Sequence, residues 1–447
     1  MSTLYIRGGC PIRGRVRVPG DKSIGHRALL FSALAEGRSR IHGLSHGEDN
    51  VSTARALEAM GVKLRLFDGG LAEVHGVGLR GLRPSEKDID CGNSGTSMRL
   101  FTGLLAAQHF RSVLTGDASL RSRPMRRVVH PLVAQGARIA GAKGKNAEDI
   151  YPPLVIEGMK PGEQLKGINY DMPVASAQVK TALLLGGLYA SGPTVLKEPL
   201  LSRDHTERMF LALGVPIETA GSAIMLDPRG WRRGWDAVDW SIPSDLSSAA
   251  FVLALARLVP DSHVELENVG VNPTRTGFLD AMRLMGANIV HMPKGDAGVG
   301  EPVATLQMSY GALRGILLGG ELLTRMIDEV PIACALGAHA DGTTEIRDAA
   351  ELRVKESDRI SSMAETLAAF GIMSTQYPDG LRIEGGQPRA AARVNSHGDH
   401  RIAMTAAVLA MATEGESVIE DVGCIETSFP GFTELMRTLG AGIEQRA

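Results

Sequence analysis

The sequence predicts a two-domain α/β protein built from repeats of one helix-and-strand unit. Its 447 residues exceed what one hydrophobic core usually organises, so two domains of about 200 residues each are expected. A sequence pattern in which an apolar helix ends in glycine and continues into an aliphatic strand occurs six times. A second, uniformly apolar helix precedes each occurrence of this pattern. The pattern indicates six similar units in a pseudo-symmetric chain.

The recurring glycines are expected to end one helix of each unit. Phrases such as "LEAMGVKL" and "MRLMGANI" fit a left-handed glycine C-cap that releases the chain into a strand. The intervals between successive glycines are 75, 78, 72, 85 and 69 residues. The period is therefore that of a supersecondary unit and not of a short solenoid. The six glycines are Gly61, Gly136, Gly214, Gly286, Gly371 and Gly440.

The other helix of each unit is expected to be buried. These segments are rich in Ala, Gly and Leu on nearly all sides, which is typical of inner helices and not of amphipathic surface helices. Strand-like pieces follow them. The inner helices are predicted at 26–37, 96–107, 179–192, 248–259, 330–342 and 401–415, and the strands at 39–44, 112–116, 194–199, 263–269, 344–348 and 417–422.

Composition excludes several classes of protein. The net charge is −2 and mean hydropathy is near zero, so no global attraction to nucleic acid or membrane is expected. No leader or membrane-spanning segment is recognisable. The four cysteines show no paired metal spacing, and reduced thiols in a cytoplasmic protein are expected. No metal site is predicted.

Polar and charged groups gather where the inner helices should begin, in "GDKSIGHR", "CGNSGTSMR", "VASAQVK", "PSDLSS", "IDEVP" and "HGDHRIAM". Helix N-termini suit anionic ligands. Capping is the simplest interpretation of Asp21, Ser176 or Ser247 alone. Capping does not explain cations at or within the first turns, where they oppose the dipole and cost roughly 0.3 to 1 kcal/mol each; these are Lys22, Arg27, Arg99 and Arg401. An anion-binding site is therefore predicted. For "ELRVKESDR" by itself, a solvated charged face is the simplest interpretation.

The ordered motifs resemble the enolpyruvyl transferase family, and within it the shikimate-pathway branch. The resemblance runs from "VPGDKSIGHR" through "GNSGTSMR", "GDASLRSRPM", "VASAQVKTALL", "RDHTERM", "NPTRTGFL", "MIDEVP" and "LRVKESDRI" to "GDHRIAM" and "TSFPGF". It implies a two-domain inside-out fold of six βαβαββ-type units, three per domain, with the active site in the interdomain cleft. One domain would comprise 1–20 plus 242–447, and the other 21–241.

The resemblance implies transfer of enolpyruvyl from phosphoenolpyruvate to the 5-hydroxyl of shikimate 3-phosphate, with release of phosphate. Phosphoenolpyruvate would be bound by Lys22, Asn93, Gly95, Arg123, Gln178, Arg359 and Arg401, with His400 in support. Shikimate 3-phosphate would be bound by Lys22, Ser23, Arg27, Ser176, Ala177, Gln178, Ser202, Arg203, Asp328 and Lys355. Arginine suits such ligands because its planar fork pairs with two oxygens at once.

Addition and elimination through a tetrahedral ketal require an acid, a base and fixed cations. By resemblance, Asp328 is the candidate base for the hydroxyl and Glu356 the group that moves the proton at carbon 3. Lys22 would act as an acid toward the leaving phosphate. Lys355 would hold the charge state of a carboxylate or move a proton itself. No cofactor is required, and a monomer is expected.

Three alternatives remain. The sister branch that uses a UDP-linked amino sugar has a reactive cysteine where this chain has Ala118. A non-catalytic phosphometabolite-binding protein would need no acid and base groups. An RNA-end phosphate cyclase would need a basic stripe.

Some positions differ from better-known members of the branch. Thr427 replaces a lysine, Ala177 a serine and Leu100 a proline, whereas Gly95 is glycine. Gly95 leaves room in the pocket, so glyphosate is predicted to inhibit in competition with phosphoenolpyruvate. Closure of the cleft on shikimate 3-phosphate is also expected.

Overall fold

The structure is a computed structural model that describes residues 2–143, 148–232, 234–298, 300–386 and 390–446. The chain divides into two compact units. Unit 1 comprises Met1–Asp21, Pro243–Asp296 and Pro302–Ala447, and unit 2 comprises Lys22–Ile242 and Ala297–Glu301. The chain therefore passes between units after Asp21, after Ile242, and at both ends of the short segment 297–301.

The described residues form six sheets of four strands, and each sheet has one parallel and two antiparallel pairings. In unit 2 the spatial orders are β14 (Asp239–Ser241), β3 (Glu36–His42), β5 (Leu71–Val77), β4 (Lys63–Phe67); β6 (Ile89–Asp90), β7 (Ser112–Thr115), β9 (Ile150–Glu157), β8 (Arg138–Lys143); and β10 (Ile168–Asp171), β11 (Thr194–Lys197), β13 (Ala223–Leu226), β12 (Ile217–Ala220).

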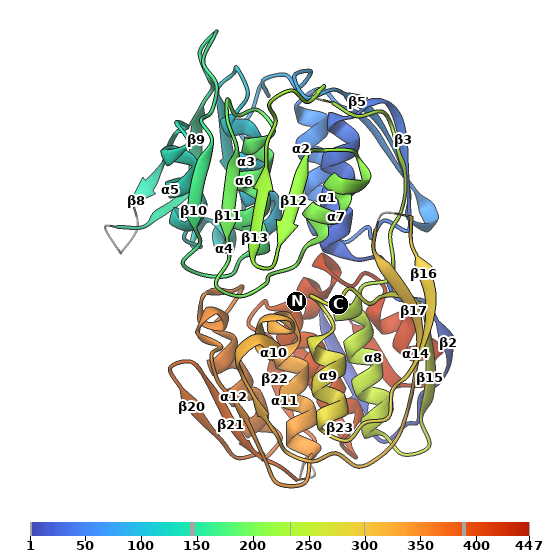
Figure 1. Ribbon diagram of the computed structural model, residues 1–447. Helices are drawn as coiled ribbons and strands as arrows, with labels where there is room; N and C mark the ends of the chain where they lie inside the picture. Colours follow the sequence, from blue (N-terminus) through green and yellow to red (C-terminus); the bar gives the residue numbers. More distant parts are fainter. Residues whose placement is uncertain (1, 144–147, 233, 299, 387–389, 447) are drawn as a thin grey trace. The chain divides into compact units, whose positions relative to one another are not determined.

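Unit 1 has the same arrangement (Figure 1). Its spatial orders are β22 (Arg393–Asn395), β23 (Glu416–Glu420), β1 (Thr3–Arg7), β24 (Gly442–Arg446); β16 (Val290–Asp296), β17 (Pro302–Ser309), β15 (His263–Gly270), β2 (Arg13–Val16); and β18 (Leu317–Leu318), β19 (Thr343–Ile346), β21 (Gly380–Glu384), β20 (Ser374–Tyr377). The six βαβαββ repeats and the six strands predicted after the inner helices are confirmed.

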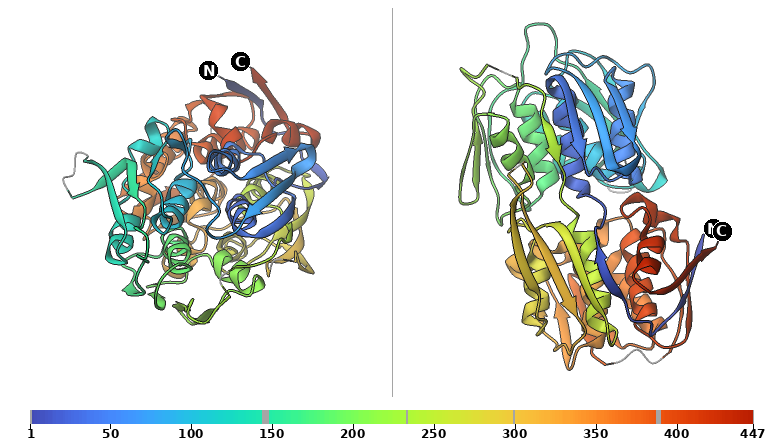
Figure 2. Two further views of the ribbon diagram at one scale, coloured as in Figure 1. Left: turned by 90° about the horizontal axis from the view of Figure 1, so that it is seen from above. Right: turned by 90° about the vertical axis from the view of Figure 1, so that its right-hand side faces the viewer.

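Strands distant in sequence complete three of the sheets. β14 runs parallel to β3, and β2 runs parallel to β15. β1 pairs with β23 on one side and with β24 on the other. The two ends of the chain therefore lie side by side in unit 1 (Figure 2).

Among the described residues, each unit contains three inner helices and three helices beside them. The inner helices are α1 (Lys22–Leu34), α3 (Gly95–Ala106) and α6 (Ala177–Gly187) in unit 2, and α8 (Leu246–Leu258), α11 (Val330–His339) and α13 (His400–Met411) in unit 1. The others are α2 (Glu48–Ala59), α5 (Arg126–Ala134), α7 (His205–Ala212), α9 (Gly277–Leu284), α12 (Arg359–Ala369) and α14 (Phe432–Thr438). Short helical turns are α4 (Ala118–Arg121), α10 (Gly320–Thr324), η1 (Asp68–Gly70), η2 (Ile327–Glu329), η3 (Ala350–Val354) and η4 (Val422–Thr427).

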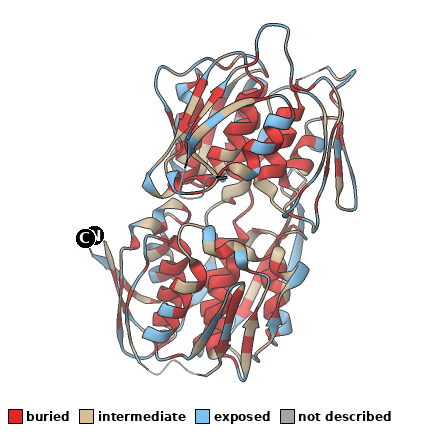
Figure 3. Ribbon diagram, turned by 90° about the vertical axis from the view of Figure 1, so that its left-hand side faces the viewer, coloured by how far each residue is buried: buried red, intermediate tan, exposed pale blue. Residues whose placement is uncertain are grey.

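Burial follows the apolar composition of the inner helices. All 13 residues of α8 and all 12 of α13 are buried, and within each unit the inner helices are almost continuously buried (Figure 3). Each unit has its own hydrophobic core. Since a fully buried Leu or Phe side chain stabilises the fold by about 1.5 to 3 kcal/mol, each core can support its own unit.

The six repeat glycines end helices as predicted. Their φ angles lie between 69° and 109°, a region that disfavours any residue with a Cβ atom. A strand begins two to four residues after each of them. Across the described ranges, no helix has both the length and the apolar character that membrane crossing requires.

Candidate active site

In unit 2 the predicted residues lie at or near the starts of the three inner helices. Lys22 begins α1, Gly95 begins α3 and Ala177 begins α6. Arg99 joins α3 to α6: its Nη1 donates to the Gly95 carbonyl at 3.1 Å and to Oε1 of Gln178 at 3.0 Å. Gln178 returns a hydrogen bond to Thr96 Oγ1 at 2.8 Å. The Gly95 turn and Gln178, which are 83 positions apart, are therefore held together.

Asn93 and Arg123 meet on the other side of the Gly95 turn. Arg123 Nη2 donates to Asn93 Oδ1 at 2.6 Å and to Ser119 Oγ at 3.2 Å. Asn93 in turn donates to Asp117 Oδ2 at 2.7 Å. Arg123 is only 7% exposed, so its fork is oriented by these oxygens before any ligand arrives.

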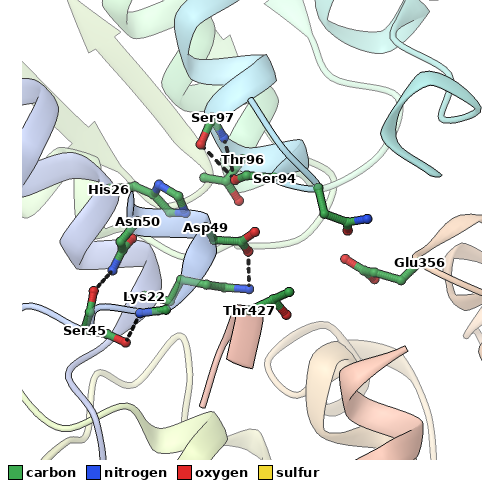
Figure 4. A network of polar contacts seen from close by, with 12 residues as sticks. Lys22, His26, Ser45, Asp49, Asn50, Ser94, Thr96, Ser97, Glu356 and Thr427 are labelled. Carbon is green, nitrogen blue, oxygen red and sulfur yellow. Dashed lines mark hydrogen bonds and ion pairs between the residues drawn. The ribbon is translucent and has the colours of Figure 1, made fainter. Parts of the chain in front are cut away.

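Lys22 is paired with Asp49, which the sequence analysis did not identify. Nζ of Lys22 lies 2.9 Å from Asp49 Oδ2, and both side chains are largely shielded from solvent (Figure 4). Asp49 lies in the first turn of α2, where a carboxylate is favoured by the dipole. "HGEDN" carried a weak signal, because two adjacent acids open that helix.

A chain of hydroxyl groups connects the same helices. His26 Nδ1 lies 2.7 Å from Thr53 Oγ1, Thr53 Oγ1 lies 2.6 Å from Ser97 Oγ, and Ser97 donates to Ser94 at 2.8 Å. Ser94 also caps α3 by accepting from the Ser97 amide. His26, Ser94 and Ser97 are drawn with Lys22 and Asp49 in Figure 4. The chain ties α1, α2 and α3 together behind the Lys22 ammonium.

Arg27 is held by three oxygens of unit 2. Its Nε and Nη2 atoms donate to the hydroxyls of Thr206 and Thr181, both at 2.7 Å, and Nη1 donates to the Ser23 carbonyl at 2.8 Å. Its side chain crosses toward α6 and α7 and is buried. These hydroxyl and carbonyl acceptors fix the orientation of the Arg27 guanidinium.

Ser176, Ser202 and Arg203 lie near the start of α6 and in the loop before α7. Ser176 is the N-cap of α6, so its capping interpretation is confirmed; its hydroxyl oxygen accepts from the Val179 amide at 3.4 Å. Ser202 donates to Glu198, which also binds Lys180. Arg203 is half-buried in the same loop.

In unit 1, Asp328, Lys355 and Arg359 converge. Lys355 Nζ and Arg359 Nη1 each lie 3.7 Å from Asp328 Oδ1. Lys355 also lies 3.4 Å from Glu351. Asp328 belongs to the turn η2 before α11, and Arg359 begins α12. A carboxylate and two cations from separate segments therefore face one another.

Arg359 is further bound by Asp399 and Glu356. Its Nε lies 2.8 Å from Asp399 Oδ2, and its Nη2 lies 2.7 Å from Glu356 Oε2. Burial acts to lower the pKa of Arg359, but the Asp399 and Glu356 carboxylates outweigh burial and raise it. Burial likewise acts to raise the pKa of Asp399, but Arg359 and His400 together hold it below its ordinary value. Arg359 is 2% exposed, so the solvated-face interpretation of "ELRVKESDR" is wrong for this residue.

His400 and Arg401 open α13 beside these groups. Asp399 caps the helix by accepting from the Arg401 amide at 2.8 Å. His400 is buried and helps to lower the pKa of Asp399. Arg401 Nη1 lies 3.7 Å from Oε1 of Glu329. "GDHRIAM" had pointed to His400 and Arg401, whereas Asp399 and Glu329 were missed.

One prediction about the helix starts needs correction. Lys22 and Arg401 do lie in the first turn of their helices, but Arg27 and Arg99 lie one turn further along. Leu100 is fully buried in the core of unit 2, so it can act on the site only through packing. Among the residues whose positions are described, no group of three or more His, Cys, Asp or Glu side chains is placed to hold a metal ion.

The repeated sheets around buried helices, whose polar starts hold arginine, lysine and carboxylate groups, define the class of enolpyruvyl transferases. The family model described as EPSP synthase (3-phosphoshikimate 1-carboxyvinyltransferase) matches residues 6–436. This chain belongs to the EPSP synthase family.

Individual relatives agree with this placement. A 3-phosphoshikimate 1-carboxyvinyltransferase from Alkalilimnicola ehrlichii is 48% identical over 439 residues, which cover 98% of this chain and 96% of the relative. One from Geobacter sulfurreducens is 49% identical and covers 95% and 96% respectively. A solved structure of EPSP synthase from Acinetobacter baumannii has a TM-score of 0.87 at 42% identity, with all of both chains covered.

Proposed function

We propose that the groups assembled in the two units carry out the reaction of this family. The enzyme transfers enolpyruvyl from phosphoenolpyruvate to the 5-hydroxyl of shikimate 3-phosphate and releases phosphate, a step toward chorismate and the aromatic amino acids. The observation that carries the assignment of residues is the convergence of Asp328, Lys355, Glu356 and Arg359 in unit 1. Mere binding of an anion would not need two carboxylates among the cations.

Phosphoenolpyruvate carries a phosphate and a carboxylate, and each suits a guanidinium fork. Arg123 and Lys22 in unit 2, with Asn93, Gly95 and Gln178 beside them, are assigned to this substrate. Arg359 and Arg401 in unit 1, supported by His400, complete the set. Since Arg123 and Arg359 are already oriented by resident oxygens, little of their side-chain entropy is lost when the substrate binds.

Shikimate 3-phosphate is assigned mainly to unit 2. Arg27 and Arg203 provide cations, and Ser23, Ser176, Ala177, Gln178 and Ser202 line the helix starts next to them. Asp328 and Lys355 would reach the ring hydroxyls from unit 1, and Lys22 would serve both substrates. The assigned residues are divided between the units, and closure of the enzyme on shikimate 3-phosphate is proposed to precede catalysis.

The proton transfers follow from this placement. Asp328 accepts the proton of the 5-hydroxyl as its oxygen attacks carbon 2, and Glu356 delivers a proton to carbon 3. In the elimination a methyl proton returns to Glu356, the carbon–oxygen bond to phosphate breaks, and Lys22 protonates the departing oxygen. Lys355, 3.7 Å from Asp328, stabilises the charge on that carboxylate.

The decisive experiment is phosphate release from phosphoenolpyruvate, with shikimate 3-phosphate and the UDP-linked amino sugar compared as acceptors. Release with shikimate 3-phosphate alone is expected. The UDP-sugar alternative is not favoured by the family match, and Ala118 opens α4 where that branch has its reactive cysteine. Absence of phosphate release with both acceptors would overturn the proposal.

Glyphosate is proposed as an inhibitor competitive with phosphoenolpyruvate, because Gly95 adds no side chain to the turn between Arg99 and Arg123. Activity that persists at glyphosate concentrations far above the phosphoenolpyruvate KM would contradict this. A cytoplasmic monomer is also proposed, and sedimentation of the purified chain tests its oligomeric state.

A further inference from the structure

Glu329 is a buried carboxylate that the proposed mechanism does not use. Its side chain is 1% exposed, and it precedes α11 without capping any backbone amide of that helix. Burial of a carboxylate is costly unless a cation or hydrogen-bond donors compensate it. Helix capping therefore does not explain why a charged residue occupies this position.

The partners of Glu329 connect it to Arg401. The Ser247 hydroxyl donates to Oε1 of Glu329, and Nη1 of Arg401 lies 3.7 Å from the same oxygen. Neither Oε2 of Glu329 nor Nη1 of Arg401 has a hydrogen-bond partner among the described residues. Their attraction is therefore ionic, without the hydrogen bond that would make it strong and directional.

Arg275 holds this arrangement from the other side. Its Nη2 atom donates to Ser247 Oγ at 2.8 Å and to Asp245 Oδ1 at 3.1 Å, and it lies 3.8 Å from Asp21. Arg275 is 4% exposed. Because Arg275 fixes Ser247 and Ser247 fixes Glu329, the carboxylate is kept from moving closer to Arg401.

We propose that Glu329 is a positioning residue and resident counter-anion for Arg401, and that Ser247 and Arg275 hold Glu329 at a distance from it. Phosphoenolpyruvate must compete with the Glu329 carboxylate for Arg401. The inference rests on the proposed assignment of Arg401 to that substrate. Without ligand, the Glu329 carboxylate and the neighbouring Asp245 together compensate the charge of the buried Arg401 guanidinium. When phosphoenolpyruvate binds, the negative charge of Glu329 repels its anionic groups. Glu329 therefore lowers the affinity for phosphoenolpyruvate while it stabilises the protein without ligand.

Two variants should move the phosphoenolpyruvate KM in opposite directions. Glu329→Gln keeps the shape and the Ser247 acceptor but removes the charge, so KM is expected to fall by about fivefold or more, the usual range of coupling between two sites. Ser247→Ala frees the carboxylate to approach Arg401, so KM is expected to rise. When Glu329→Gln and Ser247→Ala are combined, Ser247→Ala should no longer raise the KM, because that effect requires the Glu329 carboxylate.

The measurement is phosphate release at saturating shikimate 3-phosphate, combined with the phosphoenolpyruvate-induced shift in melting temperature. Without ligand, Glu329→Gln should have a lower melting temperature than wild type. Phosphoenolpyruvate should raise the melting temperature of Glu329→Gln by more than it raises that of wild type. Glu207→Gln, a buried carboxylate paired with Lys180 in unit 2, is the matched control and should melt lower without a fall in KM. A Glu329→Gln KM that is unchanged or raised would overturn the inference.

The Arg401→Gln variant distinguishes a failure of the role proposed for Glu329 from a failure of the substrate assignment of Arg401. If this variant leaves the phosphoenolpyruvate KM unchanged, the assignment of Arg401 is wrong. If it raises KM while Glu329→Gln and Ser247→Ala both leave KM at the wild-type value, only the inference about Glu329 fails. Should Glu329→Gln not fold, Ser247→Ala still decides, because a KM that does not rise contradicts the proposal.

Discussion

The Nζ atom of Lys180 lies 2.6 Å from Oε1 of Glu207, and both side chains are almost completely shielded from solvent. Lys180 also binds Glu198 at 2.8 Å, and Glu198 accepts from the hydroxyl of Ser202. Burial raises the pKa of Glu207 even though Lys180 acts to lower it. One buried lysine thus anchors the loop that carries Ser202 and Arg203.

Lys180→Met is expected to destabilise unit 2 by about 3 to 5 kcal/mol, because it leaves two buried carboxylates without their cation. It should also raise the KM for shikimate 3-phosphate. Urea unfolding and steady-state kinetics measure the two effects. Lys63→Met, at an exposed position of β4, is the control, and an equal loss in both variants would contradict the prediction.

Asp49→Asn is expected to lower kcat/KM by about ten- to a hundredfold, because Lys22 loses the carboxylate 2.9 Å away that orients it. The matched control is Glu48→Gln, the adjacent and exposed acid of the same helix turn, which should behave as wild type. Phosphate release at varied concentrations of each substrate makes the comparison. Wild-type kinetics in Asp49→Asn would show that Lys22 needs no such partner.

Gly95→Ala is expected to raise the phosphoenolpyruvate KM and to weaken glyphosate inhibition. A Cβ atom at this position would lie 2.8 Å from Arg99 Nη1 and 3.4 Å from Arg123 Nη1. Arg99 could yield only by giving up its bonds to the Gly95 carbonyl and Gln178. In the control Gly192→Ala the new atom would meet nothing closer than 3.9 Å. Equal inhibition constants in wild type and Gly95→Ala would refute the prediction.

The stability of unit 1 should depend on pH through Asp245. Burial, followed by the neighbouring Asp21, raises the pKa of Asp245 from 3.8 to about 6, although Arg275 and Arg401 act to lower it. The folded state therefore holds this proton more tightly than the unfolded state. The resulting stability is fully present below pH 3.8 and is lost as pH rises through about 6.

Asp245→Asn keeps an N-cap residue but cannot titrate. Its stability relative to wild type should therefore increase between about pH 4 and pH 7, by up to about 3 kcal/mol at 1.36 kcal/mol per pKa unit. Thermal or urea unfolding of both proteins across this range tests the slope. A constant difference would mean that Asp245 has an ordinary pKa in the folded state.

Much of the architecture could be predicted from local patterns. An apolar helix, a C-cap glycine and a strand obey rules that act over a few residues, so each occurrence could be recognised independently. The same holds for groups at helix starts such as Lys22 and Arg401, where a cation opposes the dipole. Their roles as ligands came from resemblance to a family and not from such patterns.

The sequence by itself determined the six repeats, their buried helices and the charged helix starts, because periodicity and capping are local properties. Only the tertiary structure decided which charges meet. Asp49 beside Lys22, Asp399 beside Arg359, and Glu329 between Ser247 and Arg401 join positions from 27 to 82 residues apart. Pairings over such distances depend on how helices pack in the folded core, and no spacing rule along the chain encodes them.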